Sequence, residues 1–185
     1  FRSENGRIDL NFAPKQLLVA LFTVLGTERE TAEGFADRII AWRTPRPRTA
    51  DSEEILYRTA GKNYGPRHGP FQHVNELGLV LGLTSDIVDR ALPYMTVYSG
   101  QPEVNVLNAA PVVLAALPGL TPERLQILLA QREGAPQDIL NAQLGMAAQY
   151  VTVQSSRANR VIVDVRFDAN RQLRSEAIVL LLDDD

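Results

Sequence analysis

The sequence predicts an α+β fold in which a long helical part is followed by a small antiparallel sheet. From about residue 13 to residue 146, apolar residues recur at helical spacing between turns rich in Gly and Pro. From about residue 149 onward, apolar and polar residues alternate with a period of two, which is typical of half-buried strands. The 185 residues, 45% hydrophobic and 22% charged, suffice for one sizeable core or two small ones.

Charge and composition narrow the function classes. The net charge of −3 disfavours a nucleic-acid binder that relies on bulk electrostatics, because phosphate contacts need a local excess of Lys and Arg. Cysteine is absent from the sequence, which excludes a disulfide, a thiolate nucleophile and a cysteine-based zinc site. No stretch approaches the roughly 20 apolar residues of a membrane-spanning helix. The sequence begins at Phe1 and not at Met, so the absence of a signal or anchor from these residues says nothing about the native protein.

The helical part divides into several short helices. A helix is expected after the capping-box pattern Thr27-Glu28-Arg29-Glu30 and ends near Arg43, since the Pro-rich residues 44–48 cannot continue it. Residues 61–70, with three Gly and two Pro, form a second break. Further short helices, packed as a compact cluster, are predicted at residues 51–56, 74–81 and 85–92.

An internal repeat organises this helical part. The pattern Leu-Asn-x-Ala-Pro-x-x-Leu occurs at residues 10–17 and again at residues 107–114. In each copy the Asn side chain can bond the turning backbone, and the Pro can open a helix because its missing N–H needs no partner there. The copies also end alike, in residues 39–43 and 128–132, so each unit is interpreted as two helices joined by a turn.

The turn of the second unit, residues 117–122, is similar to a helix-hairpin-helix. Its Gly119 permits a tight backbone, Thr121 can cap the next helix and Pro122 can open it. DNA-binding hairpins carry a second glycine near phosphate, where this chain has Thr121. The neighbouring charges cancel, so we favour a structural hairpin and keep DNA binding as the alternative; they are Glu123, Arg124, Arg132 and Glu133.

The last part of the chain predicts three antiparallel strands in a meander. Within residues 161–167, the apolar side chains Val161, Val163, Val165 and Phe167 point one way, while Ile162, Asp164 and Arg166 point the other. Residues 150–154 and 173–181 are predicted as the neighbouring strands, with hairpin turns at 155–159 and 168–171. Such a sheet needs cover on one face. The visible chain has no long helix suited to it, which indicates a covering helix upstream.

An ordered set of short motifs resembles the general secretion pathway protein K family, the K-type minor pseudopilins of type II secretion. The motifs span almost the whole chain, and they are Gly6-Arg7-Ile8-Asp9-Leu10-Asn11, Gly69-Pro70-Phe71, Asn75-Glu76-Leu77, residues 92–100, Val104-Asn105-Val106 and Leu107-Asn108-Ala109-Ala110-Pro111. The family usually has Thr where this chain has Phe12 and Ala109, and the second copy has an extra residue between Asn105 and Asn108. These departures concern local capping rather than membership.

The resemblance implies a fold and a role. It implies a pilin-like domain formed by residues 1–12 and 147–185, with residues 13–146 inserted as a helical domain and an extended segment at 94–107 that returns to the sheet. Residues 1–11 would supply the first strand, and an N-terminal helix would anchor the protein in the inner membrane, with this domain in the periplasm. The implied partners are the I- and J-type minor pseudopilins at the pseudopilus tip, followed by the H type and the major pseudopilin.

Catalytic and metal-binding patterns are scarce, and we assign no catalytic, metal-binding or partner-binding residue. His68 and His73 are expected to be solvated loop residues, and Ser99, Ser155 and Ser156 structural, because none has the surroundings of a nucleophile. Glu53-Glu54 and residues 183–185 are interpreted as solvated charge. The resemblance makes calcium a conceivable cofactor; no EF-hand spacing occurs, and Asp164 and Asp168 are conceivable ligands that we do not assign.

Overall fold

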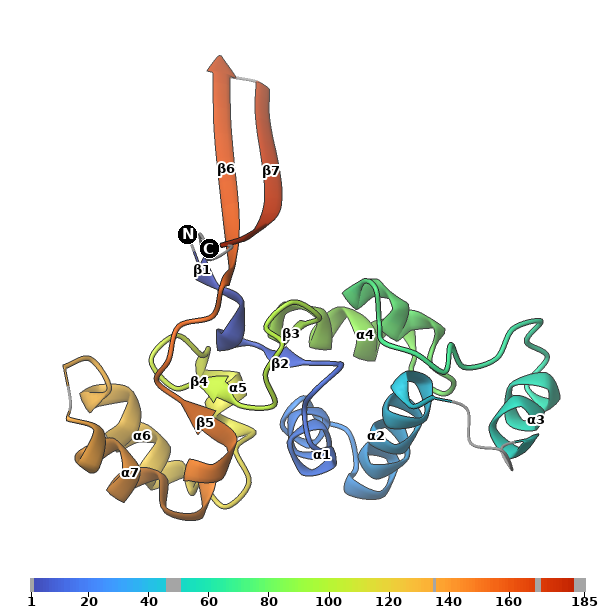
Figure 1. The fold of residues 1–185 in the computed structure, drawn as a ribbon, viewed down its shortest axis with the longest axis horizontal. Helices are drawn as coiled ribbons and strands as arrows, with labels where there is room; N and C mark the ends of the chain where they lie inside the picture. The colour runs from blue at the N-terminus through green and yellow to red at the C-terminus, as the bar shows by residue number, and fades with distance from the viewer. Residues whose placement is uncertain (1, 46–50, 135, 169–170, 182–185) are drawn as a thin grey trace, which may run out of the picture.

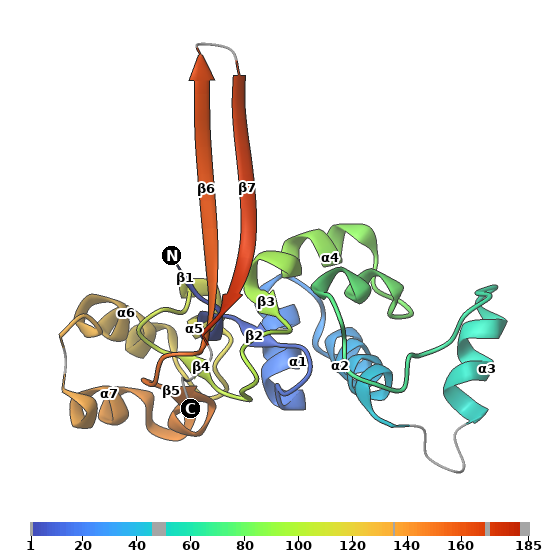
Figure 2. The ribbon, with the colours of Figure 1, turned by 45° about the horizontal axis from the view of Figure 1, so that its top comes forward.

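A helical body carries a long β-hairpin that projects from it, as Figures 1 and 2 show from two directions. The computed structural model describes residues 2–45, 51–134, 136–168 and 171–181. One connected hydrophobic core runs through the helical body. Within it Trp42 stacks on Phe71, with ring centroids 5.8 Å apart, and Phe22 packs edge-on against Phe35 at 5.5 Å.

The elements follow the predicted order of helices first and long strands last. The α-helices are α1 (Lys15–Val24), α2 (Arg29–Arg43), α3 (Asp51–Thr59), α4 (Ser85–Ala91), α5 (Pro111–Ala115), α6 (Pro122–Gln131) and α7 (Gln137–Leu144). The 3-10 turns are η1 (Glu4–Gly6), η2 (Val74–Leu79), η3 (Leu92–Tyr94) and η4 (Gly145–Tyr150). The strands are β1 (Arg2–Ser3), β2 (Ile8–Asp9), β3 (Met95–Thr96), β4 (Val104–Asn105), β5 (Val151–Thr152), β6 (Ala158–Asp168) and β7 (Arg171–Leu180).

The small antiparallel sheet is confirmed, but the predicted meander is wrong. Strands β6 and β7 pair over their full length, and the third strand is β1, in the order β1-β6-β7. The expected strand at 150–154 instead gives β5, which pairs in parallel with β4. Residues 155–159 therefore form no hairpin turn, because the chain there crosses from one sheet to another. Of the described residues of the expected first strand, Arg2 and Ser3 alone join the sheet.

The segment at 94–107 also takes a different place from the one expected. It does not return to the three-stranded sheet but supplies β3, which pairs in parallel with β2, and β4, which pairs with β5. Each two-residue ladder ties the start of a helical unit to its end. We call residues 8–96 the first module and residues 104–152 the second module.

The two modules repeat the same hydrogen bonds where their first strand ends. Asp9 and Asn105 each end a strand, accept a hydrogen bond through Oδ1 from the N–H two residues on at 2.8 and 2.9 Å, and accept another through the carbonyl from Ala13 and Ala109. Equivalent positions are 96 residues apart, whereas matching the Asn letters of the motif, Asn11 with Asn108, puts them 97 apart. Aligning the two copies by their Asn residues is therefore wrong by one residue. The capping oxygens belong to Asp9 and Asn105, which precede the Leu-Asn motif in each copy.

An arginine closes each module at the equivalent place. Arg43 donates from Nη1 and Nη2 to the carbonyls of Leu10 and Ala13 at 2.6 and 2.7 Å. Arg132 donates from Nη1 to the carbonyls of Ala109 and Val106, at 2.7 and 3.4 Å. These are the last residues of the repeated endings noted in the sequence, so the repeat extends from the first strand of each module to α2 in one and α6 in the other.

Local capping agrees with the sequence at one helix and not at another. Thr121 caps α6 as predicted, its hydroxyl accepting from the N–H of Arg124 at 3.4 Å with Pro122 at the first position. The capping box at Thr27 was wrong, because α2 is preceded by Glu28 with no side-chain cap, and Thr27 Oγ1 is buried without a hydrogen-bond partner among the described residues. The expected helix at 74–81 is the shorter 3-10 turn η2, capped by His73.

Candidate interaction surface on the projecting hairpin

The β6–β7 hairpin has one apolar face. In an antiparallel pair, residues directly opposite each other point to the same side. On one side Val161 lies opposite Ala177, Val163 opposite Ser175 and Val165 opposite Leu173. We call the side chains of Val161, Val163, Val165, Leu173, Ala177 and Val179 the apolar face. The predicted alternation is confirmed up to Arg166, after which a bulge before Asp168 shifts the register at Phe167.

The opposite face is polar. Ile162 lies opposite Glu176, Asp164 opposite Arg174 and Arg166 opposite Gln172. Asp164 forms an exposed ion pair with Arg174 at 3.9 Å, so its carboxylate already has a cationic neighbour. The two faces of the same hairpin therefore present different chemistry to a partner.

The apolar face is uncovered by the described part of the chain. Val163 is 48% exposed, Leu173 55% and Val179 42%, and Figure 1 shows the hairpin standing away from the helices. An isolated two-stranded hairpin is marginally stable at best in water. A contiguous exposed apolar surface of this kind marks an interaction site. We therefore treat the hairpin as the candidate interaction surface.

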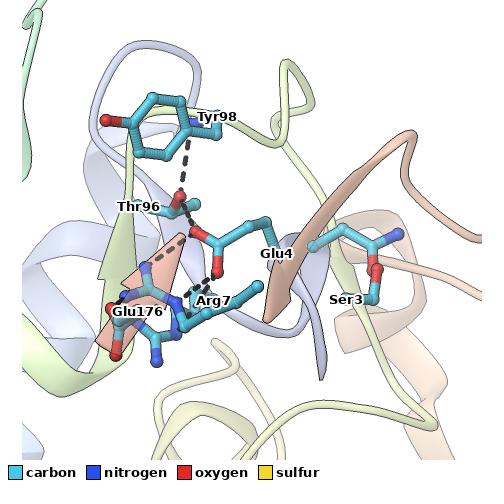
Figure 3. Close-up of polar contacts among 8 residues, drawn as sticks. Ser3, Glu4, Arg7, Thr96, Tyr98 and Glu176 are labelled. Carbon is cyan, nitrogen blue, oxygen red and sulfur yellow. Dashed lines mark hydrogen bonds and ion pairs between the residues drawn. The ribbon is translucent and has the colours of Figure 1, made fainter. Parts of the chain in front are cut away.

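A cluster of charged and hydroxyl side chains fixes the base of the hairpin, and Figure 3 shows how they converge on Glu4. The Glu4 side chain is 1% exposed and lies in η1, directly after β1. Arg160 of β6 donates to Glu4 from Nε and Nη2 at 2.7 and 3.1 Å, and Thr96 of β3 donates to it from its hydroxyl. Arg160 also pairs through Nη1 with Glu176 of β7.

This polar joint, defined as Glu4, Arg7, Thr96, Arg160 and Glu176, connects three parts of the fold. Glu4 comes from the N-terminal segment, Thr96 from the end of the first module, and Arg160 and Glu176 from the hairpin. A bidentate arginine–carboxylate pair fixes orientation as well as distance. The joint therefore sets the direction in which the hairpin leaves the helical body.

A second set of contacts ties the joint to the second module. Asn5 and Asn105 both donate from Nδ2 to the carbonyl of Gln154, at 2.7 and 2.9 Å, and Ser3 donates to Asn5 at 2.7 Å. Gln154 lies on the segment that leads from β5 to β6. The hairpin is thus held from both modules.

We expect Gly6→Ala to destabilise the fold by about 1–3 kcal/mol, as over-packing does. A Cβ at Gly6 would lie 2.8 Å from the carbonyl oxygen of Asn108, a backbone atom that cannot rotate away. Gly78→Ala is the control, since a Cβ there meets nothing within 4 Å, and its effect should stay within about 0.5 kcal/mol. Urea denaturation of both variants measures the difference. Equal effects would show that the close approach of the N-terminal segment to the second module is not formed.

A buried carboxyl group lies where the first module closes. Asp9, 1% exposed, accepts hydrogen bonds through Oδ2 from the Ser99 hydroxyl at 2.9 Å and the Gly100 N–H at 3.0 Å. Burial raises the pKa of Asp9 above its ordinary value, although the hydrogen bonds from Asn11, Gly100 and Ser99 act in the opposite direction.

The raised pKa predicts a pH dependence of stability. The folded state holds the Asp9 proton more tightly than the unfolded state, so this contribution is present below the ordinary aspartate pKa and is lost as pH rises through the folded value. Asp9→Asn removes the titration, and Asn105 shows that an amide fits the equivalent position. Urea denaturation from acidic to neutral pH should show the wild type losing stability relative to the variant. A wild type that gains instead would contradict the raised pKa.

The remaining candidate residues that the structure describes do not come together in a metal-binding cluster. Among the described residues, no group of three or more His, Asp and Glu could hold a metal ion. The Ser99 hydroxyl donates a hydrogen bond to Asp9 at 2.9 Å, and the Ser156 hydroxyl accepts one from the N–H of Ala158 at 3.0 Å. The side chain of Asp168 and residues 183–185 lie outside the described side chains, and the calcium expectation stays a prediction.

Two expectations of solvated side chains were wrong. His73 is exposed and caps η2, but the His68 side chain is 13% exposed, and its two ring nitrogens are buried without a hydrogen-bond partner among the described residues. Its Nε2 lies 4.0 Å from Glu54 Oε1. Glu53 Oε2 is also buried without a hydrogen-bond partner. Helix α3 and the loop at 61–70 pack on each other more closely than their polar sequences indicate.

The polar joint was missed in the sequence. Glu4 and Arg160 are 156 residues apart, and no local pattern connects them. The only local signal is Arg7 three residues after Glu4, whose Nε lies 4.0 Å from the Glu4 carboxylate. In the described part of the chain, no helix has the length and hydropathy of a membrane span.

Comparison with known proteins gives the chain its family. A solved structure of similar fold, titled the crystal structure of the GspK-GspI-GspJ complex from the type 2 secretion system of enterotoxigenic Escherichia coli, superposes with a TM-score of 0.65 at 16% sequence identity. The match covers 98% of this chain and 73% of the other. The curated proteins gave no match. Residues 5–100 match the family described as Type II secretion system (T2SS), protein K. That match covers more than half of the sequence, and the chain therefore belongs to the type II secretion system protein K family of minor pseudopilins.

Proposed function

We propose that the chain acts at the tip of the periplasmic pseudopilus, where it assembles with the I- and J-type minor pseudopilins and supports protein export across the outer membrane. The H-type and the major pseudopilin would follow below this tip. The proposed role is assembly without enzymatic turnover. The observation that carries it is the uncovered apolar face of the hairpin in a member of the protein K family.

The shape of the molecule supports a terminal position. The helical body is far wider than the hairpin that projects from it, as Figure 2 shows. A subunit of this shape would interrupt a regular filament if subunits had to pack both above and below it. We propose that residues 1–12 and 147–185 form the pilin-like part, with residues 13–146 carried on it as the helical domain.

We propose that the apolar face packs against helices. The first is the N-terminal helix of the same protein, which also anchors it in the inner membrane, and the others are the N-terminal helices of the neighbouring minor pseudopilins. Its alternating valines and Leu173 offer the flat surface that an amphipathic helix can cover. The outer edge of β7 is unpaired in the described sheet order and could also receive a strand. The solved complex of similar fold has I and J partners in its title, which agrees with this proposal.

Size-exclusion chromatography with light scattering tests this assembly. The chain is mixed with soluble I- and J-type domains from the same genome, and a stable ternary peak is expected. Leu173→Asp on the apolar face should abolish the peak, whereas Gln172→Asp, the adjacent residue on the polar face, should leave it unchanged. Circular dichroism of both variants checks that the fold is kept.

Two outcomes would oppose the proposal. If Leu173→Asp binds as the wild type does, the apolar face is not the interface. If the wild-type domains elute separately, the mixture is repeated with full-length proteins in detergent, and a second failure overturns the assembly role. Salt-sensitive retention of the chain on duplex DNA would instead support the helix-hairpin-helix alternative, which stays a prediction.

A further inference from the structure

A cavity of about 400 Å³ lies where the N-terminal segment, η3 and the second module meet. Three arginines line it, namely Arg2 from β1, Arg7 from the segment after η1, and Arg132 from the end of α6. Among its described lining residues there is no Asp or Glu. This concentration of positive charge is unexpected in a chain whose net charge is −3. We call this cavity the arginine pocket.

Arg7 has unused hydrogen-bonding capacity in the described structure. Its side chain is 22% exposed, and its described ionic contact is the 4.0 Å approach of Nε to Glu4. Glu4 accepts its hydrogen bonds from Arg160 and Thr96, and its approach to Arg7 is longer than these. Burial first, and then the nearby charges of Arg160 and Arg2, lower the pKa of Arg7, although the charge of Glu4 acts in the opposite direction. A half-buried guanidinium without a close counter-ion is costly, and an anion would relieve that cost.

The other two arginines also keep donors available. Arg132 uses Nη1 for the carbonyls that close its module, and its other nitrogens make no hydrogen bond within the described structure. Arg2 has its backbone in the β1–β6 pairing and its side chain exposed. Arg7 also lines a neighbouring cavity of about 650 Å³ with Arg160 and Glu176, so the described lining of that cavity includes a carboxylate. The described lining of the arginine pocket has three arginines and no acidic residue.

We propose that the arginine pocket binds a phosphomonoester group, with Arg7 as its principal donor. Guanidinium forks bind phosphate oxygens in pairs, and three cations match a doubly charged phosphate better than a single carboxylate. The volume exceeds that of a phosphate ion and suits a small organic molecule. Pro93, Leu107 and Val113 line the pocket and provide an apolar surface for the carbon part of such a ligand. The phosphate could belong to a small soluble ester or to a lipid headgroup.

Nuclear magnetic resonance of the arginine Nε–H groups tests the site directly. The ¹⁵N-labelled chain is titrated with inorganic phosphate and then with glycerol 3-phosphate, at ionic strength held constant with sodium chloride. We expect saturable shifts of a small number of arginine signals, with a Kd at or below about 1 mM for the ester. Arg7→Gln should weaken binding at least tenfold, and Arg7→Lys should weaken it less.

A matched surface variant separates a built site from general charge. Arg29→Gln removes an arginine whose side chain is 80% exposed and paired with Glu33, and it should leave the affinity unchanged. If Arg7→Gln lowers the thermal midpoint, Arg2→Gln on the exposed first strand gives an independent test. The proposal is overturned if the wild type shows no saturable shift, or if Arg29→Gln weakens binding as much as Arg7→Gln does.

Vesicles distinguish the two sources of the phosphate. Phosphatidic acid vesicles are compared with phosphatidylcholine vesicles in a flotation assay. Flotation that depends on Arg7 and competes with glycerol 3-phosphate assigns the pocket to a lipid headgroup, whereas soluble-ester binding without flotation assigns it to a small molecule. Flotation that is independent of Arg7, without saturable binding of either soluble phosphate, contradicts the proposal.

Discussion

Glu4→Gln should destabilise the fold by about 3–5 kcal/mol, because it leaves the Arg160 guanidinium buried without its main counter-ion. The side chains of Glu4 and Arg160 are 1% and 11% exposed, so water cannot readily replace the lost carboxylate. A neutral amide can accept only part of the hydrogen bonds that Arg160 and Thr96 now donate. Urea denaturation at neutral pH measures the loss.

Two further variants define what this loss means. Glu176→Gln removes the other partner of Arg160, and since the Glu176 side chain is 43% exposed, we expect about 1 kcal/mol or less. The double variant Glu4→Met with Arg160→Met removes both buried charges and should recover much of the stability lost in Glu4→Gln. If Glu176→Gln costs as much as Glu4→Gln, or if the double variant is no better, the buried pair is not what holds the joint.

The joint also links stability to assembly. When Arg160 loses the Glu4 carboxylate, β6 still pairs with β7 through the backbone. The hairpin, however, loses its fixed direction relative to the helical body. Glu4→Gln should therefore weaken the ternary complex even at temperatures where the chain remains folded. Chromatography with the I- and J-type domains measures this, and an unchanged complex would show that the hairpin binds its partners independently of the body.

The long hairpin and several of the helices were predictable from the sequence because their signals are local. Alternation over residues 161–165 is sufficient to define a two-sided strand, and the Pro residues after Arg43 define the end of α2. Membership of the protein K family was also predictable, since its motifs follow one another along the chain. These features need no knowledge of what lies across the fold.

The short strands could not be predicted, because a two-residue ladder has no periodicity. Val151–Thr152 fits a meander by its pattern, and its pairing with β4 depends on the closure of the second module. The polar joint could not be predicted from local patterns either, since it is formed by residues from opposite ends of the chain. The failed cap at Thr27 shows that tertiary packing can bury a hydroxyl that local rules assign to a helix terminus.

The module repeat predicts a ranked effect of two arginine substitutions. Arg43→Met should cost about 3 kcal/mol, because it removes two short charge-assisted hydrogen bonds and leaves the carbonyls of Leu10 and Ala13 without these donors. Burial lowers the pKa of Arg43, which agrees with a guanidinium held largely away from water. Methionine keeps the apolar length of the side chain, so the loss reports the hydrogen bonds more than the packing.

Arg132→Met should cost less, about 1–2 kcal/mol, because one of its two contacts is 3.4 Å long. Arg29→Met, which removes an exposed ion pair, should change stability by about 0.5 kcal/mol or less. If Arg43 and Arg132 hold their modules in the same way, urea denaturation should show the largest loss of stability for Arg43→Met, a smaller loss for Arg132→Met and the smallest for Arg29→Met. Arg132→Met as neutral as Arg29→Met would mean that the second module is held by its β4–β5 ladder alone. The repeated arginine would then matter there only as a lining residue of the arginine pocket.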